Sequence, residues 1–128
     1  MFLDKNSIII NGVQMGQYIV QAQYTYNKLW ANDSGRNLAG VMSGTLIGIF
    51  PKIVLHFRAL NKTDLEIITP ILDSQNQTVT YYDPTKKTNV TITTYTGDYE
   101  IVNKHTVDTN ERKNEGFSCS FIAVRKRT

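Results

Sequence analysis

The chain contains one cysteine, Cys119, so an internal disulfide is impossible and the class of small disulfide-stapled secreted scaffolds is excluded. No apolar run approaches the roughly 20 residues that a membrane-spanning helix needs. The first residues, Met1 to Asn6, lack the charged stretch and the long apolar stretch of a signal peptide. We therefore expect a protein that folds in a reducing cytoplasm and has no membrane partner.

Residue patterns that carry catalysis are also scarce. No cysteine and histidine cluster has zinc spacing, and neither a phosphate-binding glycine loop nor a nucleophile elbow is present. His56 falls on the polar side of an extended run and His105 in a polar loop. Cys119 alternates with Phe117 and Phe121, a pattern typical of a small buried side chain. The sequence thus predicts a protein that is not an enzyme and needs no metal or cofactor.

Alternation of apolar and polar residues with a period of two dominates the chain and predicts β-strands. Two short runs flank Asn11-Gly12, the dipeptide most favoured in a type I′ hairpin turn. A long strand is expected over residues 17–30, with Tyr18, Val20, Ala22, Tyr24 and Tyr26 on one side. Further strands are expected over residues 41–50, 53–60, 78–82, 89–96, 99–102 and 117–123.

One helix is predicted to interrupt these strands. Thr63 and Glu66 fit a capping box at its start, and Leu65, Ile68 and Leu72 recur at helical spacing. Pro70 limits the helix to two or three turns. Residues 103–116 are polar, charged and aperiodic, which predicts a mobile loop. The fold class is therefore mainly β: one domain over residues 1–128, an antiparallel β-sandwich or barrel with one short α-helix.

Basic residues gather at the end of the chain, in Arg125, Lys126 and Arg127. Such a tail is typical of a solvated terminus that protects a strand edge, and it also favours contact with nucleic acid. Four tyrosines near the lysines of the turn after residue 83 are compatible with a base-stacking surface of the OB type: Tyr81, Tyr82, Tyr95 and Tyr99. Because tyrosine is a favoured strand residue, we interpret them as core and ordinary surface, and expect only non-specific binding of nucleic acid.

The order of several motifs resembles a family of small structural proteins of tailed phages and prophages of low-GC Gram-positive bacteria. The similarity covers residues 12–99 and is carried by Asn11-Gly12-Val13, Asp33-Ser34-Gly35-Arg36-x-Leu38-x-Gly40, a charge-free run through Gly48, the capped helix, Tyr82-Asp83-Pro84 and Tyr95-x-Gly97-Asp98.

The resemblance implies a non-enzymatic virion protein of the phage tail, made in the host cytoplasm and forming a ring at the tail tip or baseplate. Its implied partners are copies of itself and neighbouring tail proteins. A tail-tube or tail-terminator-like ring protein is the alternative, followed by an OB-like nucleic-acid-binding module.

Candidate subunit contacts follow from this interpretation. The Asp33-Ser34-Gly35-Arg36 loop is expected to place Gly35 at positive φ, so that the planar fork of Arg36 reaches a carboxylate or backbone carbonyls. The alternative is a solvated hairpin loop. Trp30 is expected to act as a core or interface anchor. The polar loop is expected to act as a binding arm through Lys104, His105, Arg112 and Lys113.

Overall fold

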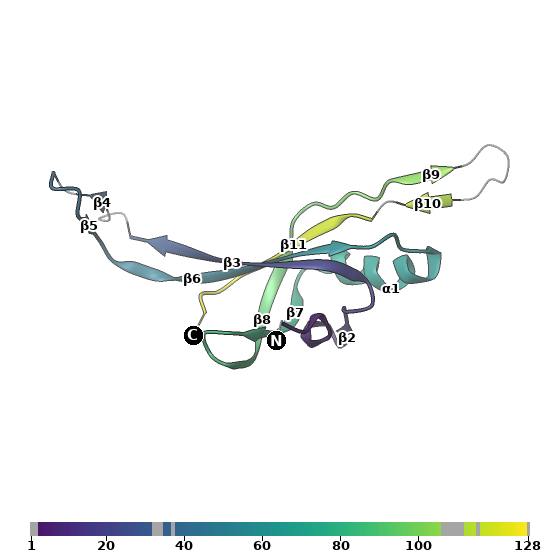
Figure 1. The fold of residues 1–128 in the computed structure, drawn as a ribbon, viewed down its shortest axis with the longest axis horizontal. Coiled ribbons are helices and arrows are strands. Elements are labelled where there is room, and N and C mark those ends of the chain that lie inside the picture. Colours follow the sequence, from purple (N-terminus) through teal and green to yellow (C-terminus); the bar gives the residue numbers. More distant parts are fainter. Residues whose placement is uncertain (1–2, 32–34, 37, 106–111, 115, 128) are drawn as a thin grey trace.

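The structure is a computed structural model that describes residues 3–31, 35–36, 38–105, 112–114 and 116–127. Within these ranges the chain forms a short 3-10 helix, one α-helix and the strands β1 to β11 (Figure 1). Their bounds are η1 Lys5–Ser7, β1 Ile9–Ile10, β2 Val13–Gln14, β3 Ile19–Trp30, β4 Gly35–Arg36, β5 Met42–Ser43, β6 Leu46–Phe57, α1 Lys62–Asp73, β7 Gln77–Asp83, β8 Thr88–Thr96, β9 Asn103–His105, β10 Arg112–Asn114 and β11 Ser118–Ala123.

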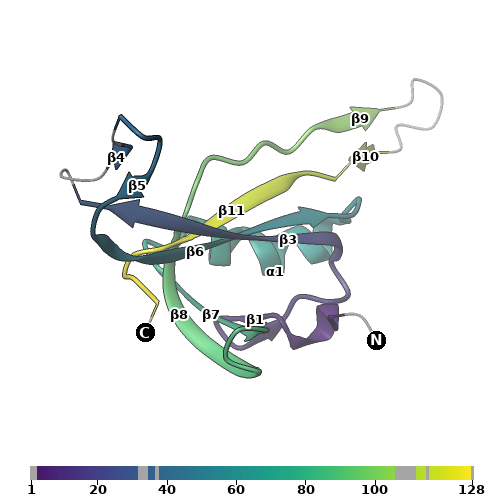
Figure 2. The same cartoon turned by 60° about the vertical axis from the view of Figure 1, so that its left-hand side comes forward.

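Seven strands form one antiparallel sheet in the order β2-β1-β7-β8-β11-β6-β3. The described residues form two further sheets of two strands each, β4 with β5 and β9 with β10. The expected fold class, mainly β with antiparallel strands and a short helix, is confirmed. The main sheet is strongly curved: rings of Tyr24 in β3 and Tyr81 in β7 lie 5.9 Å apart although three strands stand between them in the sheet (Figure 2).

The hairpin predicted from Asn11-Gly12 is present, and it joins β1 to β2. Asn11 has φ 51° and Gly12 has φ 84°, so both turn residues are left-handed as a type I′ turn requires. The side-chain oxygen of Asn11 also accepts a hydrogen bond of 2.9 Å from the N–H of Thr78 at the start of β7. One local motif therefore fixes both the turn and its place against the next strand.

Strand β3 differs from the expected face pattern at its beginning. Its register with β6 shifts between Ile19 and Gln21, which marks a β-bulge, and Val20 is 71% exposed. Beyond the bulge, Ala22, Tyr24 and Tyr26 are half-buried as predicted. The prediction that Val20 shares their face was wrong, because the extra residue of a bulge reverses the alternation.

Strand β6 is one continuous strand where two were expected. It runs through Pro51, which lies opposite Tyr26 of β3. On the other side of β6, pairing with β11 ends at Lys52. Proline is tolerated where a strand lacks a neighbour that needs its N–H, so Pro51 does not break β6 at this position.

The N-cap of helix α1 lies two residues before the start of the predicted capping box. Its N-cap is Asn61, whose side-chain oxygen accepts a hydrogen bond of 2.8 Å from the N–H of Asp64. The prediction of Thr63 as N-cap was wrong, since Asn61 performs the same role one half-turn earlier. Pro70 lies inside the three-turn helix.

The other end of α1 is attached to the sheet by side chains of two strands. The buried Gln77 of β7 donates through Nε2 to the carbonyl oxygens of Ile71 and Ser74. The hydroxyl of Thr96 in β8 donates to the carbonyl oxygen of Leu72 at 2.9 Å. Carbonyl groups that the helix itself leaves unpaired are thereby satisfied.

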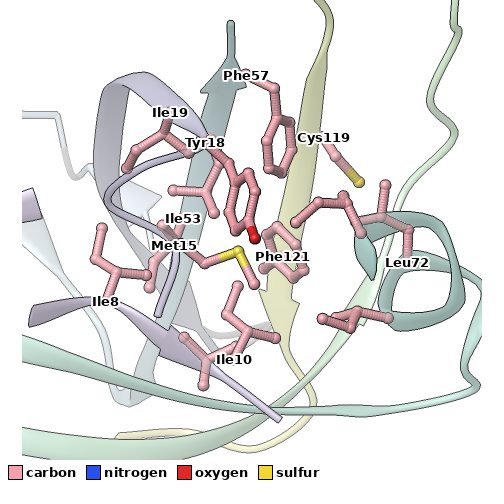
Figure 3. Packing of buried hydrophobic residues seen from close by; sticks show 14 of the residues in the cluster. Ile8, Ile10, Met15, Tyr18, Ile19, Ile53, Phe57, Leu72, Cys119 and Phe121 are labelled. Carbon is pink, nitrogen blue, oxygen red and sulfur yellow. The ribbon is translucent and has the colours of Figure 1, made fainter. Parts of the chain in front are cut away.

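The core lies between α1 and the concave side of the sheet (Figure 3). As predicted, Ile68 and Leu72 of α1 are buried there, and Cys119, Phe121 and Ala123 of β11 alternate into it. Burial raises the pKa of the Cys119 thiol to about 11, which suits a small apolar side chain. Ile8, Ile10, Met15 and Tyr18 close the core from the N-terminal side.

The chain after β8 differs from the expectation in two places. Residues 99–102 form no strand, although one was predicted there. Within residues 103–116, predicted to be aperiodic loop, the described backbone forms β9 and β10, which extend away from the core (Figure 1). The hydrogen bonds of an antiparallel pair here outweigh the low strand propensity of a polar sequence.

Candidate subunit interface

The far halves of β3 and β6 extend from the body of the protein as a two-stranded β-arm, residues 25–30 and 46–52. Pairing of β6 with β11 ends at Lys52, whereas pairing with β3 continues from Thr25 opposite Lys52 to Trp30 opposite Leu46. Figure 1 shows this arm running to one side, with β4 and β5 at its tip. The length of β3 was predicted from the alternation of the sequence, whereas β6 was expected as two strands.

The β-arm exposes four large apolar side chains. The exposed fractions are 48% for Leu29, 40% for Trp30, 41% for Leu46 and 46% for Ile47. Single exposed apolar residues are ordinary, but a group on one projecting element is typical of a protein-binding surface. Trp30 lies at the end of β3, outside the core, so of its two predicted roles only that of an interface anchor fits its position.

A shallow hollow of about 480 Å³ lies where the β-arm meets the body. It is lined mainly by apolar side chains of β3, β6, β8 and the end of β11: Leu29, Phe50, Tyr95, Ile122, Ala123 and Val124, together with Asn27 and Lys28. The apolar surface of the arm therefore continues onto the sheet.

The end of the chain holds the β-arm against the sheet through residues 124–127, here called the C-terminal segment. The N–H of Arg127 donates to the carbonyl oxygen of Ile49 at 2.6 Å, and that of Val124 to Thr93 at 3.0 Å. A Cβ placed on Gly48 would lie 2.6 Å from the side chain of Lys126, so this lysine packs directly over the arm.

Arg127 also joins a buried polar cluster made of Tyr26, Tyr81, Asp83 and Arg127. One guanidinium nitrogen lies 3.6 Å from Oδ2 of Asp83, which is fully buried, and the guanidinium lies 5.3 Å from the centre of the Tyr26 ring. The other Asp83 oxygen accepts hydrogen bonds from the N–H and the hydroxyl of Thr85, as aspartate often does in turns.

Of the two tyrosines in this cluster, Tyr81 is fully buried and Tyr26 is half-buried. The pKa of Tyr81 is raised by burial and then by the charge of Asp83; that of Tyr26 is raised by the same two causes in the same order. The prediction of a fully solvated basic tail was wrong for Arg127, because its side chain is paired inside the protein and only 18% exposed.

The other predicted contact residues lie on the arms of the molecule. Asp33 and Ser34 lie outside the described residues. Gly35 and Arg36 form β4 and pair with β5, so Gly35 is extended; the expected positive φ was wrong, and left-handed backbone falls at Gly40 instead, with φ 80°. In the β9–β10 hairpin, Lys104 stands opposite Lys113 and His105 opposite Arg112.

The basic residues of the chain end and one lysine of the turn after β7 line a second hollow, of about 220 Å³. It is lined by Lys86, Arg125, Lys126 and Arg127 together with residues 90–93 of β8. Tyr81 is fully buried, whereas Tyr95 is 44% exposed, so the four tyrosines do not form one stacking surface. His56 contacts Gln23, with Nε2 and Oε1 3.1 Å apart, on the polar side of the sheet as predicted.

Sequence reasoning missed the pairing of Asp83 with Arg127 and the bulge at Val20. The two charged residues are far apart in the chain and each looks like a surface residue in its own segment. Nothing in the residues that flank either of them signals the contact.

Among the described residues, no group of three or more histidine, cysteine and acidic side chains is arranged to hold a metal ion. The same part of the chain contains no helix with the length and apolar character needed to cross a bilayer. No protein family, curated protein or solved structure matches the chain.

Proposed function

We propose that the protein is a non-enzymatic structural subunit that assembles with copies of itself through the β-arm. The observation that carries this proposal is the exposure of Leu29, Trp30, Leu46 and Ile47 on an element that projects from the core. Covering such a surface with a neighbouring molecule removes apolar area from water, at roughly 25 cal/mol per Å². Catalytic sites are usually concave and enclosed, whereas the hollows here are shallow.

The assembly that fits best is a ring in a phage tail, at the tail tip or baseplate, with other tail proteins as further neighbours. This step rests on the resemblance of residues 12–99 to phage structural proteins. A subunit of a ring needs two contact regions, and the molecule projects two elements in different directions, the β-arm and the β9–β10 hairpin (Figure 2). A tail-tube or tail-terminator-like ring remains the alternative of the same kind.

The test is the mass of the assembly in Leu46→Asp compared with Ile67→Asp, measured by sedimentation velocity. Leu46 is 41% exposed on the β-arm and Ile67 is 40% exposed on α1, so the two variants place the same charge at similarly exposed apolar sites. We expect Leu46→Asp to lower the mass of the assembly and Ile67→Asp to leave it unchanged. Equal behaviour of the two variants, or a wild type that is monomeric at every concentration, contradicts the proposal.

The basic hollow formed by Lys86, Arg125, Lys126 and Arg127 favours nucleic-acid binding as a second candidate. With four cations in this hollow and no common stacking surface among Tyr81, Tyr82, Tyr95 and Tyr99, we expect weak, non-specific binding to single-stranded DNA that salt abolishes. Micromolar affinity at physiological salt that is lost in Tyr82→Ala would instead support an OB-like module.

A further inference from the structure

The outer edge of β3 is open beyond the first residues of the strand. β3 is the last strand of the main sheet, and no strand in the described part of the chain pairs with that edge. Its 12 residues include no proline and no glycine, and Lys28 is its one charged residue. Natural edge strands are usually short, charged or interrupted by proline, because an open edge is a template for another strand. Apart from the bulge at Val20, the charge of Lys28 is the one feature of β3 that discourages such pairing.

The backbone groups that face this opening follow from the hydrogen bonds on the other side of β6. The carbonyl of Ile49 accepts from Arg127, on the side of β6 away from β3, and Ile49 stands opposite Lys28. In an antiparallel pair successive residues direct their N–H and C=O groups to alternate sides. Lys28 therefore directs its backbone groups to the open edge, as do Ala22, Tyr24 and Tyr26.

The usable part of the edge is residues 22–30. Before it, the bulge at Val20 breaks the regular spacing, and Leu3 and Lys5 stand beside the start of β3 across a hollow. After it, β3 ends at Trp30. The middle of this stretch is Tyr26, one of the residues whose backbone faces outward.

We propose that β3 of a second copy pairs antiparallel with this edge, about a two-fold axis at Tyr26. The backbone N–H and C=O groups of the two strands then face each other at the same spacing. An isologous contact requires such self-complementarity. Lys28 of each copy stands opposite Tyr24 of the other, and Thr25 opposite Asn27. A pairing centred on Lys28 would place the two lysines opposite each other, which is unfavourable. This contact rests on the proposed assembly and names one strand that makes it. It joins two copies into a dimer, and a ring then needs a second, different contact between dimers.

Two residues of β3 with exposed side chains, Thr25 and Asn27, allow a charge-swap test of this register. Thr25 and Asn27 are both exposed, and their pair is of the non-hydrogen-bonded kind, in which side chains approach most closely. Thr25→Lys with Asn27→Lys places like charges opposite each other at two pairs. Thr25→Glu with Asn27→Lys places opposite charges there. Gln75→Lys with Asn76→Lys adds the same charge as the first variant at exposed sites away from β3.

The mass distribution of each variant is measured by sedimentation velocity over a concentration series, after a melting curve shows that it is folded. We expect dimer dissociation to be at least about tenfold easier in the Lys/Lys variant and close to wild type in the Glu/Lys and Gln75/Asn76 variants. An oligomeric wild type whose mass neither β3 variant changes overturns the edge contact and leaves the proposed function standing. A Glu/Lys variant as weakened as the Lys/Lys variant also overturns the register. A wild type that stays monomeric overturns both proposals.

Discussion

Replacing Arg127 by methionine tests how strongly the C-terminal segment stabilises the sheet. The substitution keeps the apolar stem and removes the guanidinium that faces Oδ2 of Asp83 at 3.6 Å. Because Asp83 is fully buried, its carboxylate is left without a counter-charge. Breaking a buried ion pair in this way costs about 3 to 5 kcal/mol. Arg127 retains 18% exposure, so water reaches the vacated position and we expect the lower end of that range.

A loss of about 3 kcal/mol lowers the melting temperature of a chain of this size by roughly 10 °C. The assay is urea unfolding followed by circular dichroism, with Arg125→Met as the control because Arg125 is exposed. The second perturbation, Asp83→Asn, keeps an oxygen for the Thr85 turn bonds and removes the charge. The double variant Asp83→Asn/Arg127→Met should lose less stability than the two single variants lose together. The difference, the coupling energy, should be about 1 kcal/mol or more. An Arg127→Met cost no larger than that of Arg125→Met, or strictly additive costs, would refute the reasoning.

Three further predictions concern the helix, the turns and the core. Asn61→Ala should cost about 1 kcal/mol in urea unfolding, because Asn61 caps α1, whereas Thr63→Ala should cost less than half of that. Gly116→Ala should destabilise the protein by more than about 2 kcal/mol, because Gly116 has φ 82° and a Cβ there would lie 2.3 Å from a backbone carbonyl oxygen. Gly12 has a similar φ of 84° but open space around it, so Gly12→Ala should cost only about 1 kcal/mol. The pKa of Cys119 is about 11 in the folded protein against an ordinary value of 9.0, so the thiol holds its proton better when folded and stability should fall as pH rises from 9 towards 11. This fall should be smaller in Cys119→Ala, and an equal fall in both proteins would show that another group is responsible.

The parts of the fold that were predictable from the sequence are those set by neighbouring residues. The Asn11-Gly12 turn needs only two residues with left-handed backbone, and the alternation from Phe117 to Ala123 needs only one buried face. The position of α1 followed from its apolar spacing. Its first residue did not, because Asn61 and Thr63 are both good caps and the choice depends on how the chain leaves β6.

The features that sequence reasoning missed depend on contacts between distant segments. Pro51 lies inside β6 because pairing with β11 has already ended there, which local propensity cannot reveal. The burial of Asp83 and Arg127 depends on the C-terminal segment crossing the β-arm. The apolar residues of the β-arm were predicted to lie in strands, but their exposure depends on the length by which β3 and β6 extend past the core.

Native mass spectrometry of the wild-type protein, sampled over a concentration series, tests the central claim most directly. If the β-arm and the edge of β3 bind other copies, the spectrum will contain species at even multiples of the 14.5 kDa chain, and their share will grow with concentration. A single species of 14.5 kDa at every concentration would contradict the account.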